Sequence, residues 1–167
     1  MRRFKIISPI LALAIAAGVA VQAGAQAQAP APATCRGVPA TIVGTAGNDS
    51  IVGTDGADVI QALAGNDRVV GIRGNDLMCG DRDDDRLSGG NGVDRMFGEA
   101  GNDELRSGGG DDQAVGGAGD DDVFGGEGDD HLVGSTGNDR LDGGAGFDVC
   151  SPGPGIDVVL NCERVVR

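Results

Sequence analysis

Aspartate recurs at every ninth residue of this chain from Asp49 to Asp157, without a gap or an insertion. A fixed short period indicates a coil that stacks one unit on the next, so it constrains the architecture before any local propensity does. It also constrains the chemistry, because a column of carboxylates either repels itself or holds cations. The thirteen aspartates are Asp49, Asp58, Asp67, Asp76, Asp85, Asp94, Asp103, Asp112, Asp121, Asp130, Asp139, Asp148 and Asp157.

The other positions of the nine-residue unit, which repeats over residues 44–160, are also regular. The fourth is glycine in every unit except at Asp83, the first is mostly glycine, and the eighth is always apolar. Glycine permits positive φ, so the first six residues are predicted to form a tight turn and the last three a very short strand. Two units then complete one coil, which places equivalent turns on the same side about 4.8 Å apart.

Units such as GGAGDDDVF (116–124) and GGEGDDHLV (125–133) match GGxGxDxUx, so the chain resembles the hemolysin-type calcium-binding repeat proteins, the RTX family. The resemblance implies an all-β fold, a parallel β-roll (a two-sheet β-helix solenoid) of thirteen nonapeptide repeats. It also implies Ca²⁺ between neighbouring turns, held by the thirteen aspartates and by carbonyls of the glycine turns, at about eleven sites at most. The chain departs from the family pattern at Asp83, and Pro152 and Pro154 make the last unit a candidate cap.

Electrostatics and core size favour a metal independently of the resemblance. Two carboxylates about 5 Å apart repel by roughly 0.8 kcal/mol in bulk water and by more at a lower dielectric. Ligands that are all oxygens suit Ca²⁺ better than Zn²⁺, copper or Mg²⁺. The chain has no Trp or Tyr and only four Phe. A core with so few large apolar side chains needs a bound metal or a covalent cross-link for stability.

The first residues have the features of an export signal. Arg2, Arg3 and Lys5 precede an apolar stretch at 6–21, and small residues then allow cleavage after Ala25 or Ala27. We predict a signal peptide at 1–25, a linker and N-terminal cap at 26–43, the calcium-binding roll at 44–160 and a C-terminal cap at 161–167. The protein is then secreted by a Sec-type route with no membrane span after cleavage; a retained anchor is the alternative.

Four cysteines in an exported chain indicate disulfides, for which three pairings are possible. A bond between Cys150 and Cys162 closes a short C-terminal loop, and one between Cys35 and Cys79 then ties the N-terminal lead-in to the early coils. Free structural thiols are the alternative.

The net charge of −13 disfavours nucleic acid and anionic membranes as partners. We therefore expect a secreted calcium-binding protein, not an enzyme, that folds on meeting extracellular calcium and offers an acidic surface to a protein or polysaccharide. One alternative is a toxin or enzyme accessory module, the role of such repeats in many relatives, but little sequence lies outside the repeats. The other is ice binding by Thr45 and Thr54, a threonine array that persists for only two units.

Overall fold

The computed structural model describes residues 32–167. The predicted signal peptide and its cleavage site lie outside the described residues. No helix long and apolar enough to cross a membrane occurs within residues 32–167.

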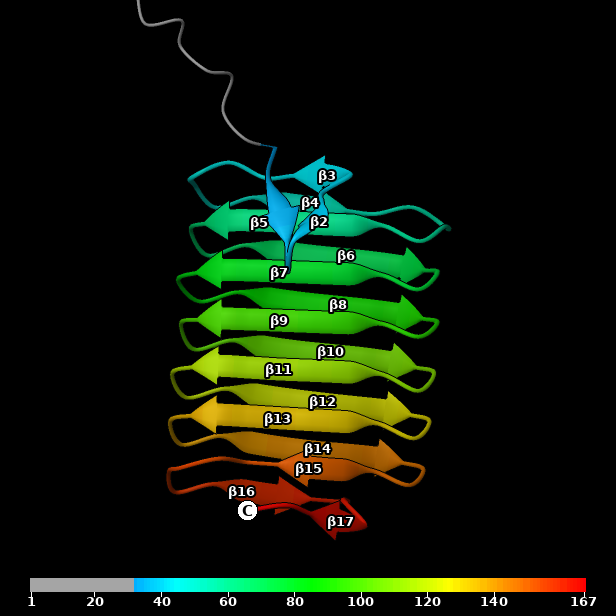
Figure 1. Ribbon diagram of the computed structural model, residues 1–167, viewed down its shortest axis with the longest axis vertical. Helices are drawn as coiled ribbons and strands as arrows, with labels where there is room; N and C mark the ends of the chain where they lie inside the picture. Colours follow the sequence, from blue (N-terminus) through cyan, green and yellow to red (C-terminus); the bar gives the residue numbers. More distant parts are fainter. Residues whose placement is uncertain (1–31) are drawn as a thin grey trace, which may run out of the picture. The chain divides into compact units, whose positions relative to one another are not determined.

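The described chain is an all-β solenoid in which successive units alternate between two parallel sheets (Figure 1). Except at the C-terminal end, neighbouring strands in a sheet pair residues that are eighteen positions apart, such as Leu105 with Val123, so one coil consists of two units, as predicted. The seven-stranded sheet contains β4 (Ser50–Val52), β6 (Arg68–Arg73), β8 (Arg86–Asn91), β10 (Glu104–Gly109), β12 (Asp122–Glu127), β14 (Arg140–Ala145) and β16 (Val158–Leu160). The eight-stranded sheet contains β3 (Ile42–Val43), β5 (Val59–Ala64), β7 (Leu77–Arg82), β9 (Arg95–Ala100), β11 (Gln113–Ala118), β13 (His131–Thr136), β15 (Val149–Ser151) and β17 (Arg164–Val165).

The strands are longer than the three residues predicted from the repeat. From β5 to β14 each strand has six residues, because it continues through the first three positions of the next unit. The second position takes a positive φ, as at Gly90 and Gly108, yet these two residues still pair across parallel strands. The prediction of a six-residue turn is therefore wrong, and only the fourth to sixth positions turn the chain.

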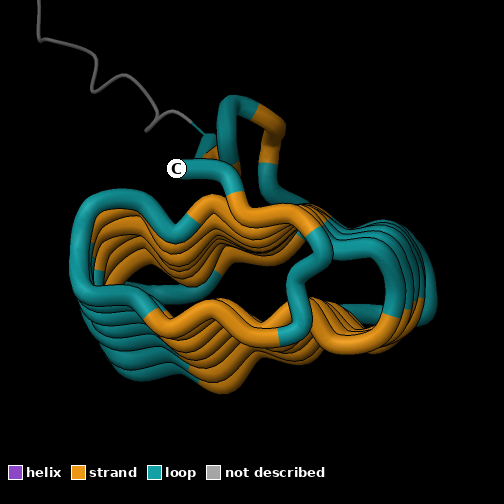
Figure 2. The backbone as a smooth tube through the Cα atoms, turned by 90° about the horizontal axis from the view of Figure 1, so that it is seen from below, coloured by secondary structure: helices purple, strands orange, loops and turns teal. Residues whose placement is uncertain are grey.

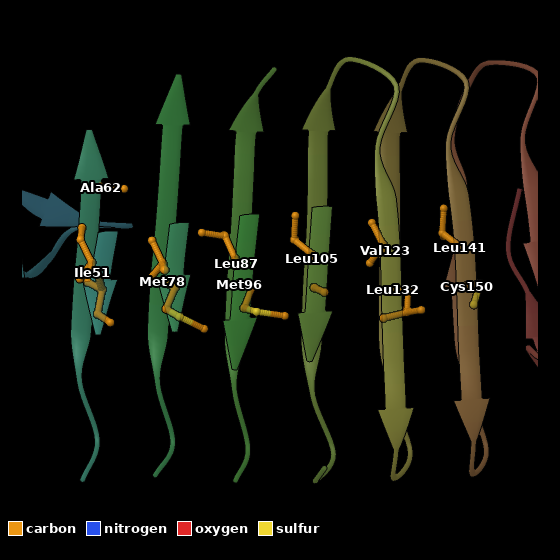
Figure 3. Close-up of a cluster of buried hydrophobic side chains, with 13 residues drawn as sticks. Ile51, Ala62, Met78, Leu87, Met96, Leu105, Val123, Leu132, Leu141 and Cys150 are labelled. Atoms are coloured by element: carbon orange, nitrogen blue, oxygen red, sulfur yellow. The ribbon is translucent and has the colours of Figure 1, made fainter. Parts of the chain in front are cut away.

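The interior of the coil is lined by the sixth, eighth and first positions of each unit, since alternate residues of a strand face the same side. The eighth-position side chains form one continuous apolar column between the sheets (Figure 3). Leu105, Leu132 and Leu141 in this column are fully buried. Seen along the solenoid, the coil is a flattened oval with the turns at its two ends (Figure 2). The aspartates therefore lie at the ends of the oval and the apolar column at its centre.

A hairpin precedes the first coil and covers part of the eight-stranded sheet. Strands β1 (Thr34–Cys35) and β2 (Val38–Pro39) pair antiparallel, and a disulfide joins Cys35 to Cys79 of β7. Arg36 lies 4.3 Å from the centre of the Phe97 ring, which the hairpin buries on the outer face of the sheet. A second disulfide joins Cys150 to Cys162, so both predicted pairs are present.

Candidate metal centres

The thirteen repeat aspartates form two columns, one at each end of the oval. Every aspartate of the repeat from Asp58 to Asp148 is buried, and Asp49 and Asp157 in the outermost turns are partly buried. The structure thus brings all thirteen predicted residues into line with their neighbours one coil away. One column contains Asp49, Asp67, Asp85, Asp103, Asp121, Asp139 and Asp157; the other contains Asp58, Asp76, Asp94, Asp112, Asp130 and Asp148.

One oxygen of each carboxylate links neighbouring coils. The backbone N–H of Asp94 donates to Asp112 Oδ1 at 2.7 Å, and that of Asp112 donates to Asp130 Oδ1 at 2.8 Å. The same bond joins every successive pair in both columns at 2.7–3.1 Å. The sixth-position aspartate therefore has a structural role besides any role in metal binding.

The other oxygen, Oδ2, is buried without a hydrogen-bond donor in most turns. A Cβ built on Gly89 would come closer than 3 Å to both Asp94 Oδ2 and the carbonyl oxygen of Ser107 in the next coil. Two acceptors thus converge above the first-position glycine, an arrangement that costs free energy unless a proton or a cation lies between them. The unpaired atoms are Oδ2 of Asp67, Asp76, Asp85, Asp94, Asp103, Asp112, Asp121, Asp130, Asp139 and Asp148.

Burial changes the protonation of these carboxyl groups. Desolvation, reinforced by neighbouring carboxylates, raises the pKa of Asp85, Asp112 and Asp121 to about 7. It raises the pKa of Asp103 and Asp130 to about 6. The pKa is also raised, for the same first reason, in Asp67, Asp76, Asp94, Asp139 and Asp148. A cation between the coils would favour the ionised form and oppose these shifts.

The available donors are oxygens of two kinds, aspartate carboxylates and backbone carbonyls. Within residues 32–167 no group of three or more His, Cys, Asp or Glu side chains has the arrangement of a metal site. Each gap between coils offers only two repeat carboxylates, so carbonyls must complete any coordination shell. A shell of this composition fits a hard cation with flexible geometry, which is Ca²⁺ rather than Zn²⁺.

Comparison with known families agrees with this geometry. The family model of the RTX calcium-binding nonapeptide repeat (four copies) matches residues 43–78, 70–105, 80–114, 101–132, 115–150 and 124–159. The chain belongs to this family. RTX repeats bind calcium, so the chain combines calcium-binding repeats with a parallel β-roll. No curated protein matches the sequence.

The RTX turn at Asp83 keeps the geometry of its neighbours despite the missing glycine. Asp83 takes a φ of +71°, and its Oδ2 accepts the N–H of Gly65 at 3.1 Å. Oδ2 of Asp85 in the same turn is unpaired, as in the glycine turns. The substitution therefore strains the backbone but leaves the carboxylate of the candidate site in place.

The first two RTX turns differ from those that follow. Oδ2 of Asp49 accepts the backbone N–H and the hydroxyl of Thr45 at 2.6 and 2.9 Å. Oδ2 of Asp58 accepts the same two groups of Thr54 at 2.7 and 3.0 Å. In these turns threonine satisfies the oxygen that is unpaired elsewhere, a role that sequence reasoning missed.

Two further features were not predicted from the RTX pattern. The fifth position forms a second ladder, in which Asn102 Oδ1 accepts the N–H of Asp120 and Asp120 Oδ1 accepts that of Asn138. The frequent occurrence of Asn and Asp at the fifth position was the sequence signal that could have predicted this ladder. At the C-terminal end, Glu163 Oε2 accepts the N–H of Asp148 at 2.8 Å. The nine-residue period gave no signal for Glu163, because Val166 stands where the next aspartate is due.

Proposed function

We propose that the chain is a secreted calcium-binding repeat protein that folds as Ca²⁺ binds between its stacked glycine–aspartate turns, and that it has a structural or interaction role rather than an enzymatic one. The observation that carries this proposal is the set of ten buried, unpaired Oδ2 atoms, most of which lie beside a first-position carbonyl oxygen of the next coil. A cation between the two acceptors would favour the ionised carboxylates and compensate for the missing hydrogen-bond donors.

The proposed ligands are the repeat aspartates and the first-position carbonyls. In an inner gap, Asp94 contributes its free Oδ2, Ser107 its carbonyl oxygen and Asp112 its carboxylate. The two columns have eleven gaps between repeat aspartates, but Thr45 and Thr54 already satisfy Asp49 and Asp58 in the first gap of each. We therefore assign calcium to the other nine, within the upper limit of about eleven that the sequence predicts. Bound Ca²⁺ supplies positive charge that neutralises the columns.

Secretion is consistent with the chemistry of the fold. The leader predicted at 1–25 directs the chain to an oxidising compartment, where disulfides such as Cys35–Cys79 and Cys150–Cys162 persist. Extracellular calcium would then trigger folding after export. A rigid roll with a strongly acidic surface fits a partner that is an extracellular protein or polysaccharide.

Calcium titration of the oxidised, mature protein tests the proposal. We expect a disordered circular-dichroism spectrum in excess chelator at neutral pH and a β spectrum as calcium is added, with bound calcium counted by equilibrium dialysis. Magnesium at the same ionic strength is the control for simple charge screening. A chelated protein that is fully ordered at neutral pH and retains no ion would overturn the proposal.

A single aspartate tests the proposed ligands. Asp121→Asn keeps an oxygen for the N–H of Asp103 but removes the negative charge from two adjacent gaps. We expect this variant to bind one or two fewer ions and to fold at a higher calcium concentration. The matched control is Asp122→Asn, because Asp122 is the next residue and its side chain faces solvent. Loss of all binding in Asp121→Asn would contradict independent sites along the column.

A further inference from the structure

The second aspartate column ends at Asp148, but the arrangement of acceptors continues for one more gap. In the inner gaps three groups recur: a free Oδ2, a first-position carbonyl of the next coil and the carboxylate that accepts the aspartate N–H. Asp148 has no aspartate one coil ahead, since Val166 occupies that place. The end of the column is therefore expected to lack the third group.

Glu163 supplies the third group from outside the repeat. Its Oε2 accepts the N–H of Asp148 at 2.8 Å, the bond that aspartate Oδ1 makes in every other coil. Strand β17 then pairs with β15 as the earlier strands pair, with the N–H of Arg164 donating to the carbonyl of Asp148 at 3.0 Å. Glu163 thus takes the sixth position of a shortened turn, although it stands three residues early in the sequence.

The other two groups are also present at this end. Asp148 is fully buried and its Oδ2 has no donor. A Cβ built on Gly143 would come closer than 3 Å to both Asp148 Oδ2 and the carbonyl oxygen of Asn161. Asn161 lies eighteen residues after Gly143, so its carbonyl holds the first-position place. Glu163 follows Asn161 by two residues, whereas the sixth position of a full unit follows the first by five. The extra methylene of glutamate compensates for part of this difference.

We propose that Asp148, Glu163 and the carbonyl of Asn161 form an additional terminal Ca²⁺ site outside the nonapeptide pattern. The proposal rests on the proposed function, since it presumes that the inner gaps bind calcium. The Cys150–Cys162 disulfide fixes the site, because it bonds a residue two positions after Asp148 to the residue before Glu163. Reduction of this bond frees the segment that carries Glu163, so the affinity of the terminal site depends on the redox state.

Glu163→Gln is the test variant, because glutamine still accepts the N–H of Asp148 and so preserves the turn. We expect it to bind one fewer ion per chain than the wild-type protein at saturating calcium, with an unchanged β spectrum. Glu127→Gln is the matched control: Glu127 is exposed on β12 and makes no ion pair within residues 32–167, so its ion count should equal that of the wild type.

A second variant pair separates this inference from the proposed function. Cys150→Ser with Cys162→Ser should weaken one site at least tenfold while the remaining sites bind as before. If Glu163→Gln binds as many ions as the wild type while Asp112→Asn loses at least one, the terminal site is refuted and the repeat sites stand. If neither the wild type nor any variant binds calcium, the proposed function fails and the terminal site fails with it.

Discussion

The sixth-position aspartate has different hydrogen-bond partners in the first two turns of the roll and in the turns that follow. Thr45 and Thr54 donate to the carboxylate of their own turn and do not take a positive φ. In the later turns the second position takes a positive φ, even where it is Leu63 or Glu99, and Oδ2 of the aspartate is left unpaired from Asp67 to Asp148. Two hydrogen bonds from threonine thus satisfy the oxygen that elsewhere needs a cation or a proton.

This difference gives the roll a polarity. The end at which threonine satisfies the aspartates is also the end that the hairpin covers and that the Cys35–Cys79 disulfide ties to β7. A disulfide lowers the entropy of the unfolded chain, which favours order in the segment it encloses. We infer that this end is the most persistent part of the calcium-free protein and that calcium-dependent order extends from it toward the C-terminus.

Calcium removal should produce the largest contrast between the two regions. In chelator at neutral pH we expect peptides covering 80–148 to lose nearly all protection from amide hydrogen exchange. Peptides covering 35–58 should exchange roughly tenfold or more slowly than these, because threonine and the disulfide hold them without metal. Hydrogen exchange with mass spectrometry, compared with the calcium-saturated protein, measures the contrast. Equal loss along the chain would contradict the polarity.

Acidification of the chelated protein should reduce the difference in order between the two regions. Protons can then neutralise the buried carboxylates in place of calcium. Burial raises the pKa of Asp85, Asp112 and Asp121 to about 7, against about 3.9 in an unfolded chain. A raised pKa in the folded state means that protonation stabilises the calcium-free roll fully below about pH 4, and that this stability is lost as the pH rises through about 7. We therefore expect chelated protein to gain β structure between about pH 7.5 and 5.

The calcium-saturated protein is the control for this pH effect and should show the opposite trend. Calcium requires the ionised carboxylates, so its affinity falls as the same groups take up protons. Circular dichroism at a series of pH values, with chelator or with calcium, distinguishes the two trends. A chelated protein that becomes steadily more ordered as the pH rises would show that the buried carboxyl groups are not the source of the instability.

The period of the sequence predicts which residues are equivalent, and this was enough for most of the fold. Equivalent residues stack one coil apart, so the two sheets, the two aspartate columns and the inward eighth position of residues such as Leu105 follow directly. The period does not say where within a unit the strand ends. The six-residue strands depend on pairing through the second position at positive φ, which becomes apparent only when Gly108 is seen beside Gly126.

The site residues that the sequence did not predict are those whose contacts are not repeated by the equivalent residues of other units. Thr45 and Thr54 looked like the start of a surface array, because no rule of the repeat assigns a hydrogen bond from the second position to the sixth. Glu163 lies three residues out of register, so only the pairing of β17 with β15 brings it to Asp148. A repeat predicts its own continuation, whereas the ends of a solenoid are determined by contacts that occur once.

A change at Thr54 should have the smallest effect and tests the threonine turns most directly. Thr54→Val keeps the shape of the side chain and the backbone N–H but removes the hydroxyl that donates to buried Asp58. We expect a loss of about 1 kcal/mol in the free energy of unfolding at saturating calcium, measured by urea denaturation. Thr136→Val is the matched control, since that exposed hydroxyl makes only a 3.4 Å contact with the carbonyl of Gly117 and should cost less than about 0.5 kcal/mol. If the two losses are equal, the hydroxyl of Thr54 does not stabilise Asp58, and the first turns would then depend on calcium as the others do.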